Sequence, residues 1–151
     1  MTVRRGSVPD VAPGAPVNTG VRLFYDGDCG LCHLAVRLAA RADRSGTVRF
    51  APLEGETSRE LIPEPERARL PDSLVLREAD GTLRVRSAAV VALLRHFGGP
   101  WQALAATLDL LPGALADRLY DAVARMRRRL FRRPREACPS LPPRLRARFD
   151  P

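Results

Sequence analysis

Two cysteines, Cys29 and Cys32, stand at the junction between a short strand-like run and an amphipathic helical run. Residues 21–25 are mostly apolar and β-prone, and they end at Asp26-Gly27, a pair typical of tight turns. After Cys29 the apolar residues recur at spacings of three and four, which predicts a helix as far as Ser45-Gly46. The chain is therefore predicted to pass from strand to turn to helix. Both sulfurs then lie near one face of the first helical turn, close enough to form a small disulfide ring.

The rest of the chain predicts three more strands and a helical second half. The segment between residues 52 and 72 is polar and rich in proline, and it is expected to hold only short helices. From Ser87, the expected N-cap, the chain is predicted to be helical. The predicted strands are 47–51, 73–77 and 83–85; the short helices are 58–62 and 64–70; the later helices end at Gly98-Gly99, at Pro112-Gly113 and near residue 130.

This order of elements predicts the fold class. A helix connects the first two strands, so these strands are expected to be parallel, whereas the turn at Asp80-Gly81 makes the last two antiparallel. The order is that of a thioredoxin-like core, which is an α/β fold with a mixed four-stranded sheet flanked by helices. The core is expected at about 21–97, with a helical C-terminal extension from about 98 to 142.

The length of 151 residues favours one domain with extensions. Residues 1–20 are rich in proline and glycine and are expected to form a disordered N-terminal tail, whereas 143–151 are expected to form a basic C-terminal tail. The thioredoxin-like domain with its helical extension is expected to fill 21–142. The sequence contains no run of 18 apolar residues and no apolar signal segment, which predicts no membrane span and a cytoplasmic location.

The positive charge is concentrated late in the chain. The formal net charge is +8, every one of the 25 basic residues is arginine, and eleven of them lie between Arg118 and Arg148. A basic segment of this kind can bind nucleic acid or an anionic membrane surface. Aromatic residues that would stack on bases are scarce there, and an all-arginine composition is typical of a GC-rich genome. A solvated helix face is therefore favoured over an anionic partner.

The position of the two cysteines at a helix start predicts thiol–disulfide chemistry. Unpaired N–H groups and the helix dipole at that end favour a thiolate, which is the attacking species in disulfide exchange. Cys29 is nearer the helix start and is the expected nucleophile. Cys32, one turn into the helix, is expected to resolve the mixed disulfide.

The same motif also fits two metal-based alternatives. A CxxC pair is half of a structural zinc site, but a second such pair is missing, and Cys138, His33 and His96 have no metal-ligand spacing. The run from Cys29 to His33 also matches the haem-attachment pattern, against which stand the preceding strand and the scarcity of methionine ligands. No metal or cofactor is therefore expected. A non-enzymatic basic binding module, with a structural or metal-binding CxxC pair, remains the second hypothesis.

Two aspartates next to the motif and one distant cysteine also have expected roles. Asp26 is expected to support the turn and Asp28 to cap the helix, and either carboxylate could instead move protons or tune Cys29. Cys138 lies in a proline-rich segment, where a structural residue without a redox role is favoured over a regulatory thiol or a partner that folds back toward the motif.

The run Phe24-Tyr25-Asp26-Gly27-Asp28-Cys29-Gly30-Leu31-Cys32 resembles the YDGxCxxC signature of the DCC family of thiol-disulfide oxidoreductases. The resemblance extends over about 21–142 and includes Asp72-Ser73, Asp80-Gly81, the run 86–89, Trp101, Pro112, Tyr120 and Cys138-Pro139. It implies a thioredoxin-like fold, a redox pair at Cys29 and Cys32, and a protein or small-molecule thiol or disulfide as substrate, with an unidentified electron donor. Asp26 is a signature residue of that family.

Two positions depart from ordinary thioredoxins. Thioredoxins hold a buried aspartate six residues before the first motif cysteine, where this chain has Leu23. They also place a cis-proline before the third strand, a position that falls near Ser73 here, with Pro71 the nearest proline. The substrate-binding edge is therefore expected to differ at Ser73, and proton transfer to Cys32 must use another group or water.

Overall fold

The computed structural model of the chain describes residues 20–27, 30–71, 73–130 and 142–151, and every structural statement below concerns these ranges. In chain order the elements are β1 (Arg22–Tyr25), α1 (Gly30–Ala42), β2 (Arg49–Pro52), α2 (Glu56–Leu61), α3 (Glu64–Arg67), β3 (Val75–Arg77), β4 (Leu83–Val85), α4 (Arg86–Phe97), α5 (Pro100–Asp109), α6 (Gly113–Leu130) and α7 (Pro143–Arg146).

The strands form one mixed four-stranded sheet in the order β2-β1-β3-β4. β1 pairs in parallel with β2, whereas β1 with β3 and β3 with β4 are antiparallel. Gly81, with a φ of 87°, closes the β3–β4 hairpin in a conformation that glycine adopts without strain. The predicted α/β fold class, the parallel first pair and the antiparallel last pair are confirmed, and the fold is thioredoxin-like.

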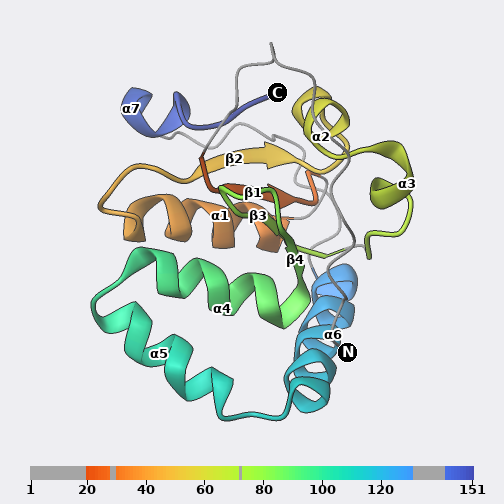
Figure 1. Cartoon of the computed structure of the whole chain (residues 1–151), viewed down its shortest axis with the longest axis vertical. Coiled ribbons are helices and arrows are strands. Elements are labelled where there is room, and N and C mark those ends of the chain that lie inside the picture. The colour runs from red at the N-terminus through yellow and green to blue at the C-terminus, as the bar shows by residue number, and fades with distance from the viewer. Residues whose placement is uncertain (1–19, 28–29, 72, 131–141) are drawn as a thin grey trace.

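Helices cover both faces of the sheet (Figure 1). Side chains alternate along each strand, so Leu23 and Tyr25 point to one face and Phe24 to the other. The first face packs against α1 and α4, with Val36, Ala40, Ala89 and Leu93 buried in that layer. The second face packs against the chain around α2 and α3 through Ile62, Leu61 and Leu70.

The helical extension is fastened to the sheet at the start of α4. The hydroxyl oxygen of Tyr120 in α6 accepts a hydrogen bond of 2.8 Å from the backbone N–H of Leu74. Ser87 was predicted to cap the helix, and this prediction is wrong: α4 begins at Arg86 with no side-chain cap. The Ser87 hydroxyl instead donates to Asp117 of α6. Arg86 itself has a φ of 53°, a left-handed conformation that costs a non-glycine residue about 1 kcal/mol.

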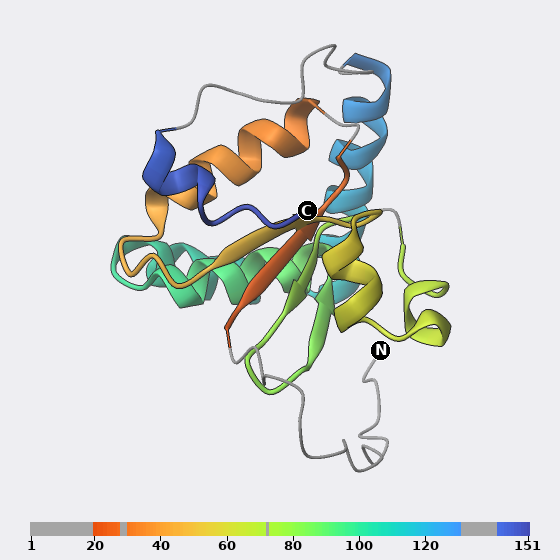
Figure 2. The same ribbon diagram turned by 90° about the horizontal axis from the view of Figure 1, so that it is seen from above.

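Residues 143–151, assigned above to a tail, lie along the outer edge of β2. A parallel bridge joins Phe149 to Phe50, with the Phe50 N–H donating to the Arg148 carbonyl and the Asp150 N–H donating to the Phe50 carbonyl. The rings of Phe50 and Phe149 stack with centroids 5.1 Å apart. Figure 2 shows this segment, in dark blue, beside β2. The segment therefore satisfies backbone groups that an edge strand would otherwise leave open.

Buried ion pairs hold this segment in place. Asp150 bonds to Arg49 and lies 2.9 Å from the guanidinium of Arg22, whose side chain is only 5% exposed. Arg148 bonds to Asp43 and to the carbonyls of Val48 and Ala40. Burial alone would raise the pKa of Asp150, but the hydrogen bond from Arg49 and the charges of Arg22 and Arg49 hold that pKa below its ordinary value.

A membrane-crossing helix is absent from the part of the chain that the structure describes, because its helices are too short or too polar to span a bilayer.

Asp150→Asn is expected to lower the free energy of unfolding by about 2 kcal/mol at neutral pH, because it leaves the buried guanidinium of Arg22 without its anion. The folded pKa of Asp150 lies below the unfolded one. Its contribution is therefore complete above the unfolded pKa of about 4, and it disappears as the pH falls through the folded pKa. Urea denaturation across this pH range should show the difference from the parent protein shrinking toward zero in acid.

Glu60→Gln is the matched control, since Glu60 is an exposed carboxylate on α2. Its effect should stay within about 0.5 kcal/mol at every pH. Equal effects of the two substitutions at neutral pH would contradict the role assigned to Asp150.

Candidate functional site

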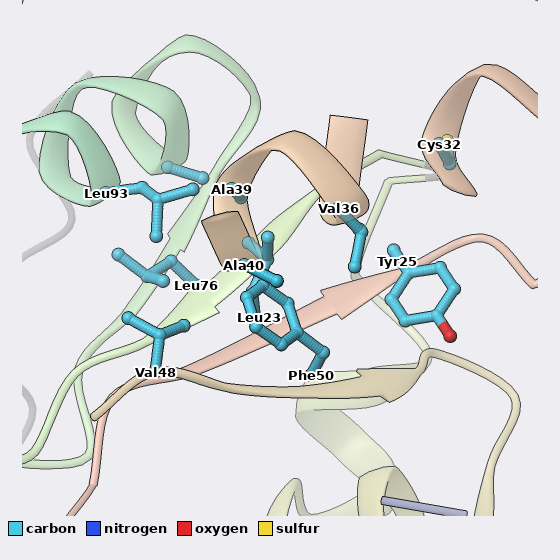
Figure 3. Close-up of a cluster of buried hydrophobic side chains, with 11 residues drawn as sticks. Leu23, Tyr25, Cys32, Val36, Ala39, Ala40, Val48, Phe50, Leu76 and Leu93 are labelled. Carbon is cyan, nitrogen blue, oxygen red and sulfur yellow. The ribbon is translucent and has the colours of Figure 1, made fainter. Parts of the chain in front are cut away.

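The cysteine motif lies where β1 passes into α1. β1 ends at Tyr25, and α1 begins at Gly30. Cys32 is 4% exposed and belongs to the core cluster that also contains Tyr25 and Val36. Figure 3 shows Cys32 toward the end of that cluster where Tyr25 lies. Cys29 and Asp28 lie outside the described residues, so their predicted roles stay predictions.

His33 joins the two ends of the segment that carries Cys29. Its Nε2 lies 2.7 Å from the carbonyl oxygen of Gly27. Since a carbonyl can only accept, Nε2 carries the hydrogen and donates it. The imidazole also meets the edge of the Tyr25 ring, with centroids 5.4 Å apart. From sequence, His33 is a candidate zinc ligand, part of a haem pattern, an ordinary residue of the second helical turn or a modest electrostatic aid to the thiolate. In the structure its side chain ties the turn to the helix, a contact that suits a positioning role.

The titratable groups around Cys32 differ from those of a thioredoxin. Leu23, at the position of the buried thioredoxin aspartate, is 2% exposed and packs in the core. Tyr25 is buried, and burial raises the pKa of its hydroxyl, so this phenol is neutral at physiological pH. Asp26 is half-buried directly after β1. A group that transfers protons to or from Cys32 would therefore lie beyond the end of β1, as Asp26 does, and not within the strand.

Ser73 lies at the same end of the sheet as the motif. The antiparallel register pairs Phe24 with Val75, and its continuation by two residues puts Ser73 across from Asp26. Ser73 is 2% exposed, its N–H donates to the carbonyl of Pro71, and its hydroxyl donates to the carbonyl of Leu74. The position expected from sequence for the substrate-binding edge thus falls beside the turn at Asp26-Gly27.

The structure separates the two histidines considered as zinc ligands. His33 bonds to Gly27 just beyond the end of β1, whereas His96 bonds to Thr47, which precedes the parallel strand β2. These points lie at opposite ends of the sheet, so the two side chains cannot hold one ion. Within the described ranges no group of three His, Cys, Asp or Glu side chains could hold a metal. Cys138 lies outside those ranges.

Sequence reasoning also missed Arg86 as a site residue. The β3–β4 register pairs Val75 with Val85, which brings Arg86 next to Leu74, and the Arg86 N–H donates to the Leu74 carbonyl at 3.2 Å. A single arginine after a short strand carries no sequence signal for this placement. It becomes visible only once the strand register is known.

Comparison with known proteins finds a matching family model and similar proteins. A family model described as DCC1-like thiol-disulfide oxidoreductase matches residues 23–133. The uncharacterized protein YuxK of Bacillus subtilis (strain 168) is 32% identical over 133 residues, which cover 85% of this chain and 93% of that protein. A chloroplastic DCC family protein of Arabidopsis thaliana is 33% identical over 114 residues, covering 74% of this chain and 64% of that protein. No solved structure shows a significant match.

His33→Ala is expected to lower the free energy of unfolding by about 1 kcal/mol, because the bond to Gly27 is lost. It should also change the rate at which iodoacetamide modifies Cys29, since the turn before the helix loses its tie. His96→Ala, which removes a histidine at the opposite end of the sheet, is the matched control. Equal modification rates for Cys29 in both variants would contradict a positioning role for His33.

Proposed function

Since the chain belongs to the DCC1-like thiol-disulfide oxidoreductase family, we propose that it exchanges dithiol for disulfide through Cys29 and Cys32. The observation that carries this proposal is the burial of Cys32 in α1, just beyond the end of β1. Cys29 then stands before the helix, at the end where backbone N–H groups and the helix dipole favour a thiolate.

The proposed reaction has two steps, written here in the reducing direction. The Cys29 thiolate attacks one sulfur of a substrate disulfide; the S–S bond breaks, and one substrate thiolate leaves with the electron pair and takes up a proton. Cys32 then loses its proton and attacks the Cys29 sulfur, which releases the second substrate thiol. Two electrons pass to the substrate, one proton comes from Cys32 and one from solvent, and a Cys29–Cys32 disulfide remains. A thiol of the cell would restore the dithiol, and the reverse sequence oxidises a substrate.

The burial of Cys32 suits the second step. Cys32 as a residue is only 4% exposed, so its thiol is shielded from disulfides in solution and reacts with a partner brought to it. We assign Cys29 the nucleophilic role and Cys32 the resolving role. Asp26 and Asp28 would stabilise the turn and the helix start, and Ser73 would border the bound substrate.

The Cys29–Cys32 pair is expected to show a reversible two-electron transition between about −120 and −270 mV in a glutathione redox series. Mass spectrometry after thiol alkylation counts the thiols at each potential, and a Cys138→Ser background removes the third cysteine. The absence of a disulfide across the series, or a metal held by the two thiols, would overturn the proposal and favour the binding module.

Cys32→Ser is expected to accumulate a mixed disulfide between Cys29 and the substrate, because the resolving thiol is gone. Cys29→Ser is expected to abolish exchange while leaving the fold intact. Non-reducing mass spectrometry after incubation with an excess of a model disulfide distinguishes the two variants. A stable adduct on Cys32 in Cys29→Ser, formed as fast as the adduct on Cys29 in Cys32→Ser, would reverse the assigned roles.

A further inference from the structure

A cavity of about 480 Å³ opens between the loop before β3, the start of α4 and one face of α6. Among the residues that the structure describes, three arginines but only one acid contribute to its lining, which includes Pro71, Ser73, Arg86, Arg118, Asp121 and Arg125. We refer to it as the arginine cavity. Its size suits a small ligand or a few residues of a peptide. Its charge excess favours an anion.

The arginine cavity lies at the end of the sheet that carries the cysteine motif. The antiparallel register places Ser73 across from Asp26, so this wall adjoins the turn that precedes Cys29. Arg86 lies beside Leu74, and its wall is therefore one strand farther from that turn. The third wall is α6. Figures 1 and 2 both show the C-terminal half of α6 beside the N-terminal end of α1, where Cys32 lies.

Arg86 is held at the cavity and forms an ion pair with Asp121. Its backbone adopts the left-handed conformation and is fixed by the bond from its N–H to the Leu74 carbonyl. Its Nε is buried and has no hydrogen-bond partner among the described residues; the Asp121 carboxylate lies 3.6 Å away. The side chain as a whole is 39% exposed, so the rest of the guanidinium can bond to an anion that enters the cavity.

Two further guanidinium groups come from α6. Arg118 and Arg125 are seven residues apart, which places them two turns apart on the same face, with Asp121 between them. Both side chains are exposed and therefore open to a ligand. The bonds of Tyr120 to Leu74 and of Ser87 to Asp117 fix this helix against the sheet, so the face is presented in a defined place.

We propose that the arginine cavity binds a carboxylate of the thiol or disulfide that reacts at Cys29, so the substrate class is acidic. This inference rests on the proposed function for the reaction itself. Guanidinium groups bind carboxylates through paired hydrogen bonds in a planar geometry, which makes arginine suited to this recognition. The carboxylate could belong to a small peptide thiol or to an acidic segment of a protein.

The first experiment compares three disulfides that differ in charge: glutathione disulfide (anionic), bis(2-hydroxyethyl) disulfide (neutral) and cystamine (cationic). Each oxidises the reduced protein, and the second-order rate constants are measured. Arg118→Gln and Arg125→Gln should each lower the rate constant with glutathione disulfide about tenfold and leave that with the neutral disulfide within about twofold. Asp121→Asn should raise the anionic rate constant a few-fold. An equal loss with all three disulfides would overturn the proposal.

Arg59→Gln is the matched control, because it removes one exposed guanidinium on α2 that does not line the arginine cavity. It should leave all three rate constants within about twofold. If Arg59→Gln lowers the rate constant with glutathione disulfide as much as Arg118→Gln does, the preference for an anionic disulfide comes from the net charge of the protein. That result would overturn the proposed local site. Disulfide-bonded peptides with acidic or neutral flanking residues, run in parallel, distinguish a protein substrate from a small one.

A second experiment does not depend on redox activity. Titration calorimetry measures the binding of S-methylglutathione, an unreactive thioether, and of its diester to a Cys29→Ser/Cys32→Ser protein. The diacid should bind at least about tenfold more tightly than the diester, and Arg118→Gln should abolish the difference. If this protein binds the diacid selectively but the parent protein shows no disulfide exchange, the cavity is upheld as a carboxylate site and the proposed redox function is refuted. If the parent protein exchanges disulfides but the double variant does not prefer the diacid, the redox function is upheld and the carboxylate site is refuted.

Discussion

The structure depends on the position of β1, which is hydrogen-bonded on both edges and covered on both faces. All four of its residues are buried, including Arg22. Because β2 pairs with it in parallel, the connection must cross over the sheet, and α1 has to begin at the end where Tyr25 stops. Because β3 pairs with it antiparallel, Ser73 has to approach that same end. The pairing of one strand therefore brings the cysteine motif and the loop before β3 together.

The buried guanidinium of Arg22 explains the path of the last residues. A charge on the central strand must be paired, because an isolated buried charge is strongly unfavourable. Asp150 provides the partner, and burial of the arginine lowers the pKa of Arg22 despite the opposing effect of that carboxylate. Phe149 adds apolar contact with Phe50 and Tyr25. A segment with three arginines and one acid is thus held by Asp150, by the bonds of Arg148 to Asp43 and to backbone carbonyls, and by the Phe149 ring. The edge of β2 supplies the backbone bonds.

The sequence predicts the core because its signals are local. Spacing identifies α1, the turn pair at Asp80-Gly81 identifies the hairpin, and the crossover rule orients the first two strands. β3 begins later than expected because the N–H of Leu74 bonds to Tyr120 and not to a strand. The placement of 148–151 and the arginine cavity depend on partners about 30 to 100 residues away, such as Arg148 with Val48, and such pairings leave no periodic signal in one sequence.

The charges at the motif end of the sheet act together on a reacting disulfide. The start of α1 favours a thiolate, and the three arginines of the cavity favour a carboxylate. As the exchange proceeds, negative charge moves from the Cys29 sulfur to the leaving sulfur, so positive charge near the leaving sulfur stabilises the transition state more than the bound substrate. Asp26 and Asp121 oppose this field, and salt screens it over about 10 Å at 0.1 M. The preference for acidic substrates should therefore weaken as ionic strength rises. It should not vanish, because salt does not screen the direct hydrogen bonds between the arginines and a bound carboxylate to the same extent.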